Sequence, residues 1–104
     1  MSPLNSSNVD SQGIIFQLDD SNNTALITGY TNLSTNDVII KRGVSDTNGK
    51  IYKVVGMTAD CLTTATTITS LTFDKTNISE FTYDVNGFPS SLSQVSFKDG
   101  IIQL

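Results

Sequence analysis

The sequence predicts a mostly-β chain, in which β-hairpins precede a short repeat array. Three observations lead to this fold class. Val, Ile and Thr fill 31 of the 104 positions, and their branched side chains favour strands over helices. Apolar and polar residues alternate in several short runs that are separated by turn-forming residues. One pattern of apolar residues recurs after 24 positions, and helix formers are scarce, with three Ala and one Glu in the chain.

The N-terminal residues 1–12 show no periodicity and are rich in Ser and Asn. We therefore expect a flexible N-terminal tail over residues 1–12 and a single β-rich domain over residues 13–104. The tail has neither a basic start nor an apolar core, so it does not have the pattern of a secretory signal.

Two β-hairpins are expected between residues 14 and 57, because four runs read as strands, and the first two of them alternate with period two. These runs cover residues 14–18, 24–30, 37–44 and about 50–57. Turn formers join the first pair and the second pair, and the second turn contains the Asn48-Gly49 step that is typical of hairpins. Further on, Ala59, Leu62 and Ala65 are spaced by three, which favours one short helical turn within residues 58–67.

An internal repeat begins at Ile68. Its apolar positions one, four and six, which are Ile68, Leu71 and Phe73, recur 24 residues later as Leu92, Val95 and Phe97, and the same offset maps Ile78 onto Ile102. A period in the twenties with this apolar spacing is typical of leucine-rich repeats. Positions four and six should then point into a solenoid core, and the residue between them should face the open concave surface. The sequence therefore predicts a β-hairpin cap followed by a short, truncated leucine-rich-repeat solenoid.

The segment 49–73 reads GKIYKVVGMTADCLTTATTITSLTF and resembles the BspA-like leucine-rich repeat family. Members of that family often read Gly-Lys-x-Tyr-x-Val, then Ile-Gly-x-x-Ala-Phe-x-x-Cys, then Leu-x-x-Val-x-Ile, with the same spacing. Met57 falls on the family's Ile, Leu62 on its Phe and Ala65 on its Cys, whereas Thr58 replaces its Gly. The resemblance implies a hairpin cap and a small solenoid. It also implies a surface protein that binds other proteins, often as an adhesin, and not an enzyme.

The predicted concave face carries small polar side chains and no aromatic residue or Arg, which are the usual hot-spot types. We expect it to bind protein partners weakly at each site, so that multivalency is needed. Its candidate binding residues are Ser70, Thr72, Asp74, Gln94, Ser96 and Lys98. The dipeptides Asp74-Lys75 and Lys98-Asp99 should lie side by side, which would place opposite charges in register.

The last residues are apolar, and a truncated solenoid would leave an open parallel edge there. A second copy of the chain or another partner would cover this end, with a two-fold dimer favoured. The candidate interface residues are Phe97, Ile101, Ile102 and Leu104. The alternative is that the end of the chain folds back and caps itself.

Several classes of function are disfavoured by composition. The chain has no His and a single Cys, which excludes Ser–His–Asp and Cys–His catalysis, His-ligated metals and an intramolecular disulfide. Its net charge of −4 argues against nucleic acid as a partner, and no apolar run is long enough for membrane insertion. Asp46-Thr-Asn48-Gly49 and Asp84-Val-Asn86-Gly87 read as tight turns and not as calcium loops. We expect no catalytic residues, no metal and no cofactor, and a core position for Cys61.

Two hypotheses of function follow. The first is a non-catalytic module for protein–protein interaction and adhesion, displayed on a cell or virion surface. The second is a structural or decoration subunit of a larger assembly, such as a virus or phage capsid, that self-associates through its open solenoid end. An extracellular surface or a virion is the expected location in either case.

Overall fold

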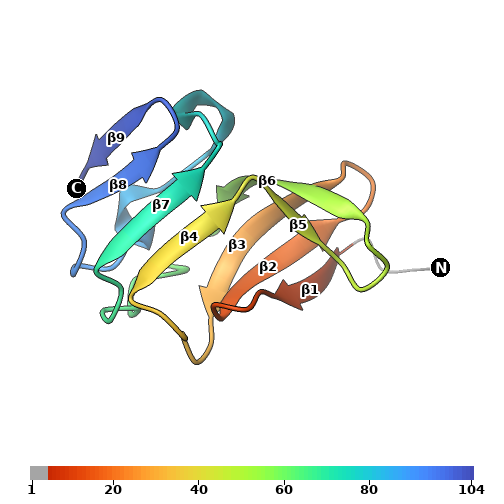
Figure 1. The fold of residues 1–104 in the computed structure, drawn as a ribbon, viewed down its shortest axis with the longest axis horizontal. Helices are drawn as coiled ribbons and strands as arrows, with labels where there is room; N and C mark the ends of the chain where they lie inside the picture. The colour runs from red at the N-terminus through yellow and green to blue at the C-terminus, as the bar shows by residue number, and fades with distance from the viewer. Residues whose placement is uncertain (1–4) are drawn as a thin grey trace.

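The computed structural model describes residues 5–104, which form nine strands and two short 3₁₀ helices (Figure 1). The strands make two sheets. The five-stranded sheet has the order β1-β2-β3-β6-β5, and the four-stranded sheet has the order β4-β7-β8-β9. This arrangement confirms the mostly-β prediction.

The five-stranded sheet contains the first predicted hairpin and the part of the second that lies next to its turn. Strand β2 (Ile14–Asp19) pairs antiparallel with β3 (Thr24–Tyr30), and β5 (Gly43–Ser45) pairs antiparallel with β6 (Ile51–Met57). A parallel pairing between β3 and β6 joins the two hairpins into one sheet. Alternate side chains of β2 are fully buried, because one face of the sheet covers the core.

The predicted N-terminal tail is wrong for residues 5–12, while residues 1–4 lie outside the described part. Strand β1 (Asn5–Val9) pairs antiparallel with β2 and forms an edge of the five-stranded sheet. The turn that follows is held by Asp10, whose Oδ1 accepts hydrogen bonds from the backbone N–H groups of Gln12, Gly13 and Ile14. A polar edge strand buries little surface, so it carries no apolar alternation by which the sequence could reveal it.

The third predicted strand, residues 37–44, breaks at Arg42 and serves two sheets. Its first part, β4 (Asp37–Lys41), leaves the hairpin and pairs parallel with β7 (Ser70–Asp74) in the four-stranded sheet. Val38 and Ile40 are fully buried and lie in register with Leu71 and Phe73. Strand β4 is therefore a further rung of the parallel sheet.

The repeat predicted from the 24-residue spacing is confirmed in β7 and β8 (Gln94–Phe97). Thr72 pairs in register with Ser96, and the apolar residues on either side of each are buried, as predicted. The rings of Phe73 and Phe97 stack with centroids 4.5 Å apart and planes within 2° of parallel. Phe81 packs against both rings, and the stack ties the two repeat units together.

The open parallel edge predicted beside β8 is not formed. After a two-residue turn at Lys98 and Asp99, strand β9 (Gly100–Gln103) runs back antiparallel along β8 and covers that edge. Ile102 is buried against the core on β9, whereas Ile78 begins a 3₁₀ helix, so this pair does not occupy equivalent positions. The C-terminal end of the chain therefore folds back and caps itself, which is the alternative stated above.

The helical turn expected within residues 58–67 is absent from the described structure, which has hydrogen-bonded turns there. The backbone N–H of Ala65 donates to Leu62 O, and that of Ile68 donates to Ala65 O. The 3₁₀ helices η1 (Ile78–Glu80) and η2 (Val85–Gly87) come later. The buried side chains of both sheets and of these turns form one continuous hydrophobic cluster. Neither helix within residues 5–104 has the length and apolar character to cross a membrane.

Candidate binding surfaces

The six predicted binding residues come together on the outer face of the four-stranded sheet. We call this set, Ser70, Thr72, Asp74, Gln94, Ser96 and Lys98, the polar face. Thr72 and Ser96 are half-buried at its centre, and the other four side chains are exposed. Strand β4 extends the same surface with Asp37, Ile39 and Lys41, because its register with β7 places them beside the polar face. A shallow hollow of about 170 Å³ lies between β7 and β8, lined mainly by Ser70, Thr72, Gln94 and Ser96.

The charge pairing predicted for the polar face does not form. Although the register places Asp74 close to Lys98, no ion pair within residues 5–104 involves Asp74, Lys75, Lys98 or Asp99. Asp99 instead accepts a hydrogen bond from the backbone N–H of Ile78 at 2.9 Å. The Ser70 hydroxyl donates to Asp37 at 2.9 Å and links β7 to β4. Hydrogen bonds therefore fix the side chains of Ser70 and Asp99 on this surface, where ion pairs were expected.

The four predicted interface residues separate into two pairs. Phe97 and Ile102 are buried in the chain's own core, at 7% and 9% exposure, which removes them from any docking surface. Ile101 and Leu104 remain exposed, at 51% and 42%. Ile101 lies on strand β9, and Leu104 follows the last residue of that strand.

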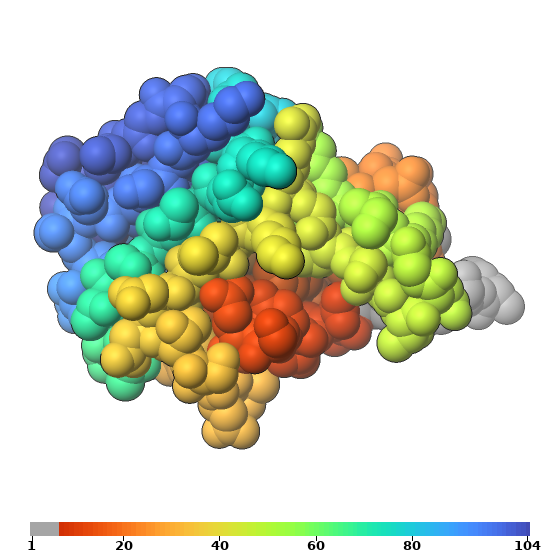
Figure 2. Space-filling model, in the orientation of Figure 1, coloured from red at the N-terminus to blue at the C-terminus, as the bar shows by residue number. Residues whose placement is uncertain are grey.

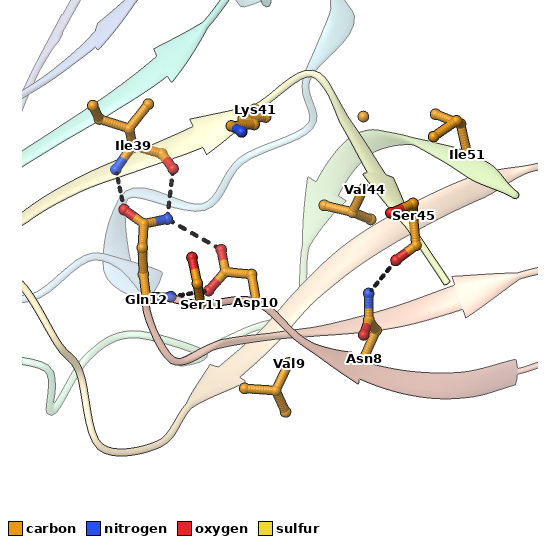
Figure 3. Close-up of a pocket in the computed structure, with 11 residues that line it drawn as sticks. Asn8, Val9, Asp10, Ser11, Gln12, Ile39, Lys41, Val44, Ser45 and Ile51 are labelled. Atoms are coloured by element: carbon orange, nitrogen blue, oxygen red, sulfur yellow. Dashed lines mark hydrogen bonds between the residues drawn. The ribbon is translucent and has the colours of Figure 1, made fainter. Parts of the chain in front are cut away.

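A larger hollow lies elsewhere, and the sequence did not predict it. It encloses about 570 Å³ between the N-terminal segment, β4, β5 and the start of β6 (Figure 3). Its lining residues are Asn8, Val9, Asp10, Ser11, Gln12, Ile39, Lys41, Gly43, Val44, Ser45 and Ile51. We call this hollow the edge pocket, because β1 and β5 are the two edges of one sheet and β4 is an edge of the other.

Two side-chain amides bridge the edge pocket. Gln12 pairs with the backbone of Ile39 through both atoms of its amide, and the Asn8 amide donates to the carbonyl of Ser45 at 2.9 Å. Figure 2 shows the N-terminal segment, in red, lying against the yellow segment that contains β4. Both amides belong to the segment predicted as a tail, so no sequence signal pointed to them.

A second polar cluster surrounds the hydroxyl of Tyr52 at the far end of the five-stranded sheet. This hydroxyl hydrogen-bonds Asp20 and Asp46, and the Lys50 ammonium pairs with Asp20 at 3.1 Å. The hydrogen bond to the Asp20 carboxylate raises the pKa of Tyr52, and the same bond, with Lys50, lowers the pKa of Asp20. The carboxylates of Asp19 and Asp46 accept hydrogen bonds from backbone N–H groups of their own turns, which for Asp46 agrees with the predicted tight turn. The arrangement fixes the hairpin turns against each other.

Residues that could act chemically are sparse in this part of the chain. Within residues 5–104, no three Asp, Glu or Cys side chains gather in a way that could hold a metal ion. Cys61 is 7% exposed, and burial raises the pKa of its thiol to about 11, which keeps it protonated at neutral pH. The thiol packs in the core, as predicted.

No known family model matches the sequence, and no curated protein is similar to it. The solved structures include a leucine-rich repeat protein from Bacteroides capillosus that is similar in fold. The likeness has a TM-score of 0.66 at 21% identity, and it covers 88% of this chain and 66% of that protein. The chain therefore has a leucine-rich-repeat-like fold, in which a hairpin cap leads into a short array.

Proposed function

We propose that the chain is a non-catalytic module that binds other proteins through its polar face. The observation that carries the proposal is the outer face of the four-stranded sheet, on which alternate side chains of β7 and β8 remain exposed or half-buried. The leucine-rich-repeat-like fold supports it, because solenoids of this kind create extended binding surfaces from one sheet. The resemblance to the BspA-like family favours display on an extracellular or virion surface and a role in adhesion.

The chemistry of the polar face favours weak contacts that act in number. Its side chains are hydroxyls, one amide and two opposite charges, with no Trp, Tyr or Arg to anchor a partner. Ser and Thr hydroxyls both donate and accept hydrogen bonds, so the surface adapts to different partner groups. Several copies displayed together would raise the overall affinity without new contacts.

The test displays the chain in many copies on beads and measures its binding to purified extracellular matrix proteins. The variant Thr72→Arg/Ser96→Arg places two large charged groups at the centre of the polar face and should abolish binding. The control variant Thr66→Arg/Thr67→Arg adds the same charges at exposed turn positions outside the face and should bind like the parent. Equal binding by the two variants would contradict a role for the polar face.

A second candidate is a structural subunit of an assembly that self-associates at β9. It is favoured by two exposed apolar side chains, Ile101 on β9 and Leu104 directly after it. Strand β9 is an edge strand without charged residues, so its free edge could pair with another chain. Light scattering over a concentration series should then show a dimer or larger species that becomes monomeric in the variant Ile101→Asp/Leu104→Asp. A parent that stays monomeric at every concentration would eliminate this candidate.

A further inference from the structure

The edge pocket has an unpaired stretch of backbone between its two amide bridges. At one end the Gln12 side chain hydrogen-bonds the backbone N–H and C=O of Ile39, and at the other the Asn8 side chain donates to the carbonyl of Ser45. Lys41 and Gly43 lie between these bridges and line the pocket. They belong to β4 and β5, which follow each other along the chain with a break at Arg42.

The alternation of backbone groups along a strand fixes where those of Lys41 and Gly43 point. Ile39 directs its N–H and C=O away from β7 and toward Gln12, so Lys41, two residues on, points the same way. The carbonyl of Arg42 accepts from Val54 N–H of β6 at 2.8 Å, so the next residue, Gly43, points away from β6. Within residues 5–104, the backbone of Lys41 has no hydrogen-bond partner on the side away from β7, and that of Gly43 has none on the side away from β6.

The opposite wall of the pocket is also a strand edge. Asp10 N–H donates to Ile14 O at 3.0 Å, which makes this a hydrogen-bonded pair between the turn and β2. Val9, one residue earlier, therefore directs its backbone away from β2 and toward the pocket. Two walls with outward-facing backbone groups enclose one space.

We propose that the edge pocket binds an extended polypeptide segment of a partner, which adds as a strand along Lys41 and Gly43. A polypeptide backbone is the ligand that supplies donors and acceptors at the spacing of a strand edge. Apolar side chains of such a segment would meet Ile39 and Ile51, which are 50% and 61% exposed beside the pocket. The volume of about 570 Å³ lies within the usual range for binding pockets. The pocket contains none of the six residues of the polar face, although Ile39 and Lys41 lie beside that face on β4.

The charges at the pocket favour an acidic segment. Lys41 is exposed and takes part in no ion pair within residues 5–104, including with Asp74, its cross-strand neighbour on β7. The carboxylate of Asp10 is already engaged by three backbone N–H groups of its own turn. A ligand can therefore pair with the Lys41 ammonium, whereas the oxygens of the Asp10 carboxylate already accept hydrogen bonds from its own turn and from Gln12.

The test titrates the isotope-labelled chain with acetylated hexapeptides in which Val alternates with Thr, Asp or Lys, and follows the backbone amide resonances. An Asp-containing peptide should shift the resonances of Lys41 and Gly43. N-methylation of the peptide amides on one edge should weaken binding about tenfold or more, because it removes strand pairing and keeps every side chain.

Charge reversal gives the matched comparison. Lys41→Glu should weaken binding of the Asp peptide several-fold and strengthen binding of the Lys peptide several-fold. Lys98→Glu makes the same change on the polar face, outside the pocket, and should leave both affinities unchanged. Circular dichroism establishes that each variant is folded.

Three results would overturn the proposal. The first is that no peptide shifts these resonances up to about 1 mM. The second is equal binding of the N-methylated peptides. The third is a shift at Lys41 and Gly43 that depends on the concentration of the chain alone, which would assign the edge to a second copy. Loss of matrix-protein binding in the polar-face variants would not affect any of these outcomes.

Discussion

The side chain of Gln12 pairs with the backbone of Ile39 as a neighbouring strand would. Its Oε1 accepts from the Ile39 N–H at 2.8 Å, and its Nε2 donates to the Ile39 carbonyl at 2.7 Å. This amide joins the N-terminal segment of the five-stranded sheet to the edge of the four-stranded sheet, 27 residues away. Asp10 accepts a further hydrogen bond from Nε2 and orients the amide.

Replacement of Gln12 by Ala should therefore lower the free energy of unfolding by about 1–2 kcal/mol, since two hydrogen bonds between the sheets are lost. Urea unfolding followed by circular dichroism measures this change. Gln17→Ala is the matched control, because Gln17 lies on β2 and makes no side-chain hydrogen bond within the described chain. Equal losses in the two variants would show that the pairing with Ile39 contributes nothing specific.

Gly13 should tolerate no side chain, whereas Gly49 should tolerate one at moderate cost. Both have positive φ, at +100° and +85°, so Ala is strained at either position. A Cβ on Gly13 would lie 2.2 Å from the carbonyl oxygen of Thr31, while a Cβ on Gly49 meets nothing within 4 Å. Gly49→Ala should cost about 1–2 kcal/mol.

Gly13→Ala should cost at least about 2 kcal/mol more than Gly49→Ala, because the clash is with backbone that the Thr31 N–H to Gly13 O hydrogen bond holds in place. Thermal unfolding of the two variants side by side gives the difference. Similar melting temperatures would show that the turn at Gly13 relaxes freely.

The predictions from sequence held where the signal was local and periodic, and failed where contacts were long-range. Leu71, Phe73, Val95 and Phe97 were found from spacing alone, because each faces the core at a fixed position of its unit. The sequence does not reveal that Val38 and Ile40 on β4 belong to the same parallel sheet as β7. The β5–β6 hairpin lies between β4 and β7 in the chain, so the 24-residue spacing does not connect these two strands.

The C-terminal strand was missed although a signal was present. Asp99-Gly100 lies between apolar runs and is a dipeptide typical of hairpins, and β8 and β9 do form a hairpin, with Lys98 and Asp99 as its two turn residues. The repeat offset, which maps Ile78 onto Ile102, favoured a continued solenoid and outweighed that turn. Gln12 and Asn8 carried no signal at all, because an amide that pairs with distant backbone has no sequence pattern. The edge pocket could therefore be found only in the folded chain.

Glu80 should make stability depend on pH in the acid range. Its Oε2 accepts from Lys53 at 2.8 Å and pairs with Arg42 at 3.0 Å, so it ties β6 and the β4–β5 junction to η1. The hydrogen bond from Lys53, then that from the Asn77 N–H and the charge of Arg42, lower the pKa of Glu80 below its ordinary value of 4.5. A carboxyl with a lowered folded-state pKa stabilises the fold above its unfolded-state pKa, and this contribution is lost as the pH falls through the folded-state value.

Glu80→Gln should accordingly reduce stability at pH 7 and reduce the loss of stability between neutral pH and pH values below 4.5. Urea unfolding at a series of pH values measures both effects. Asp74→Asn is the control, because Asp74 makes no ion pair within residues 5–104 and should leave the profile unchanged. A Glu80→Gln profile parallel to that of the parent would contradict the assignment.

Thr76 should be more stable as Val. Its side chain is 1% exposed, and its Oγ1 has no hydrogen-bond partner among residues 5–104. A buried hydroxyl without a partner costs free energy, and Val has nearly the same shape without that group. Thr76→Val should leave the free energy of unfolding unchanged or raise it by up to about 1 kcal/mol, whereas Thr76→Ala should lower it by about 1 kcal/mol through the lost methyl contacts. The carbonyl of Thr76, which accepts from Lys98 N–H at 2.9 Å, is the same in both variants. A Thr76→Val variant that is destabilised by more than about 1 kcal/mol would show that the hydroxyl binds a buried water in solution.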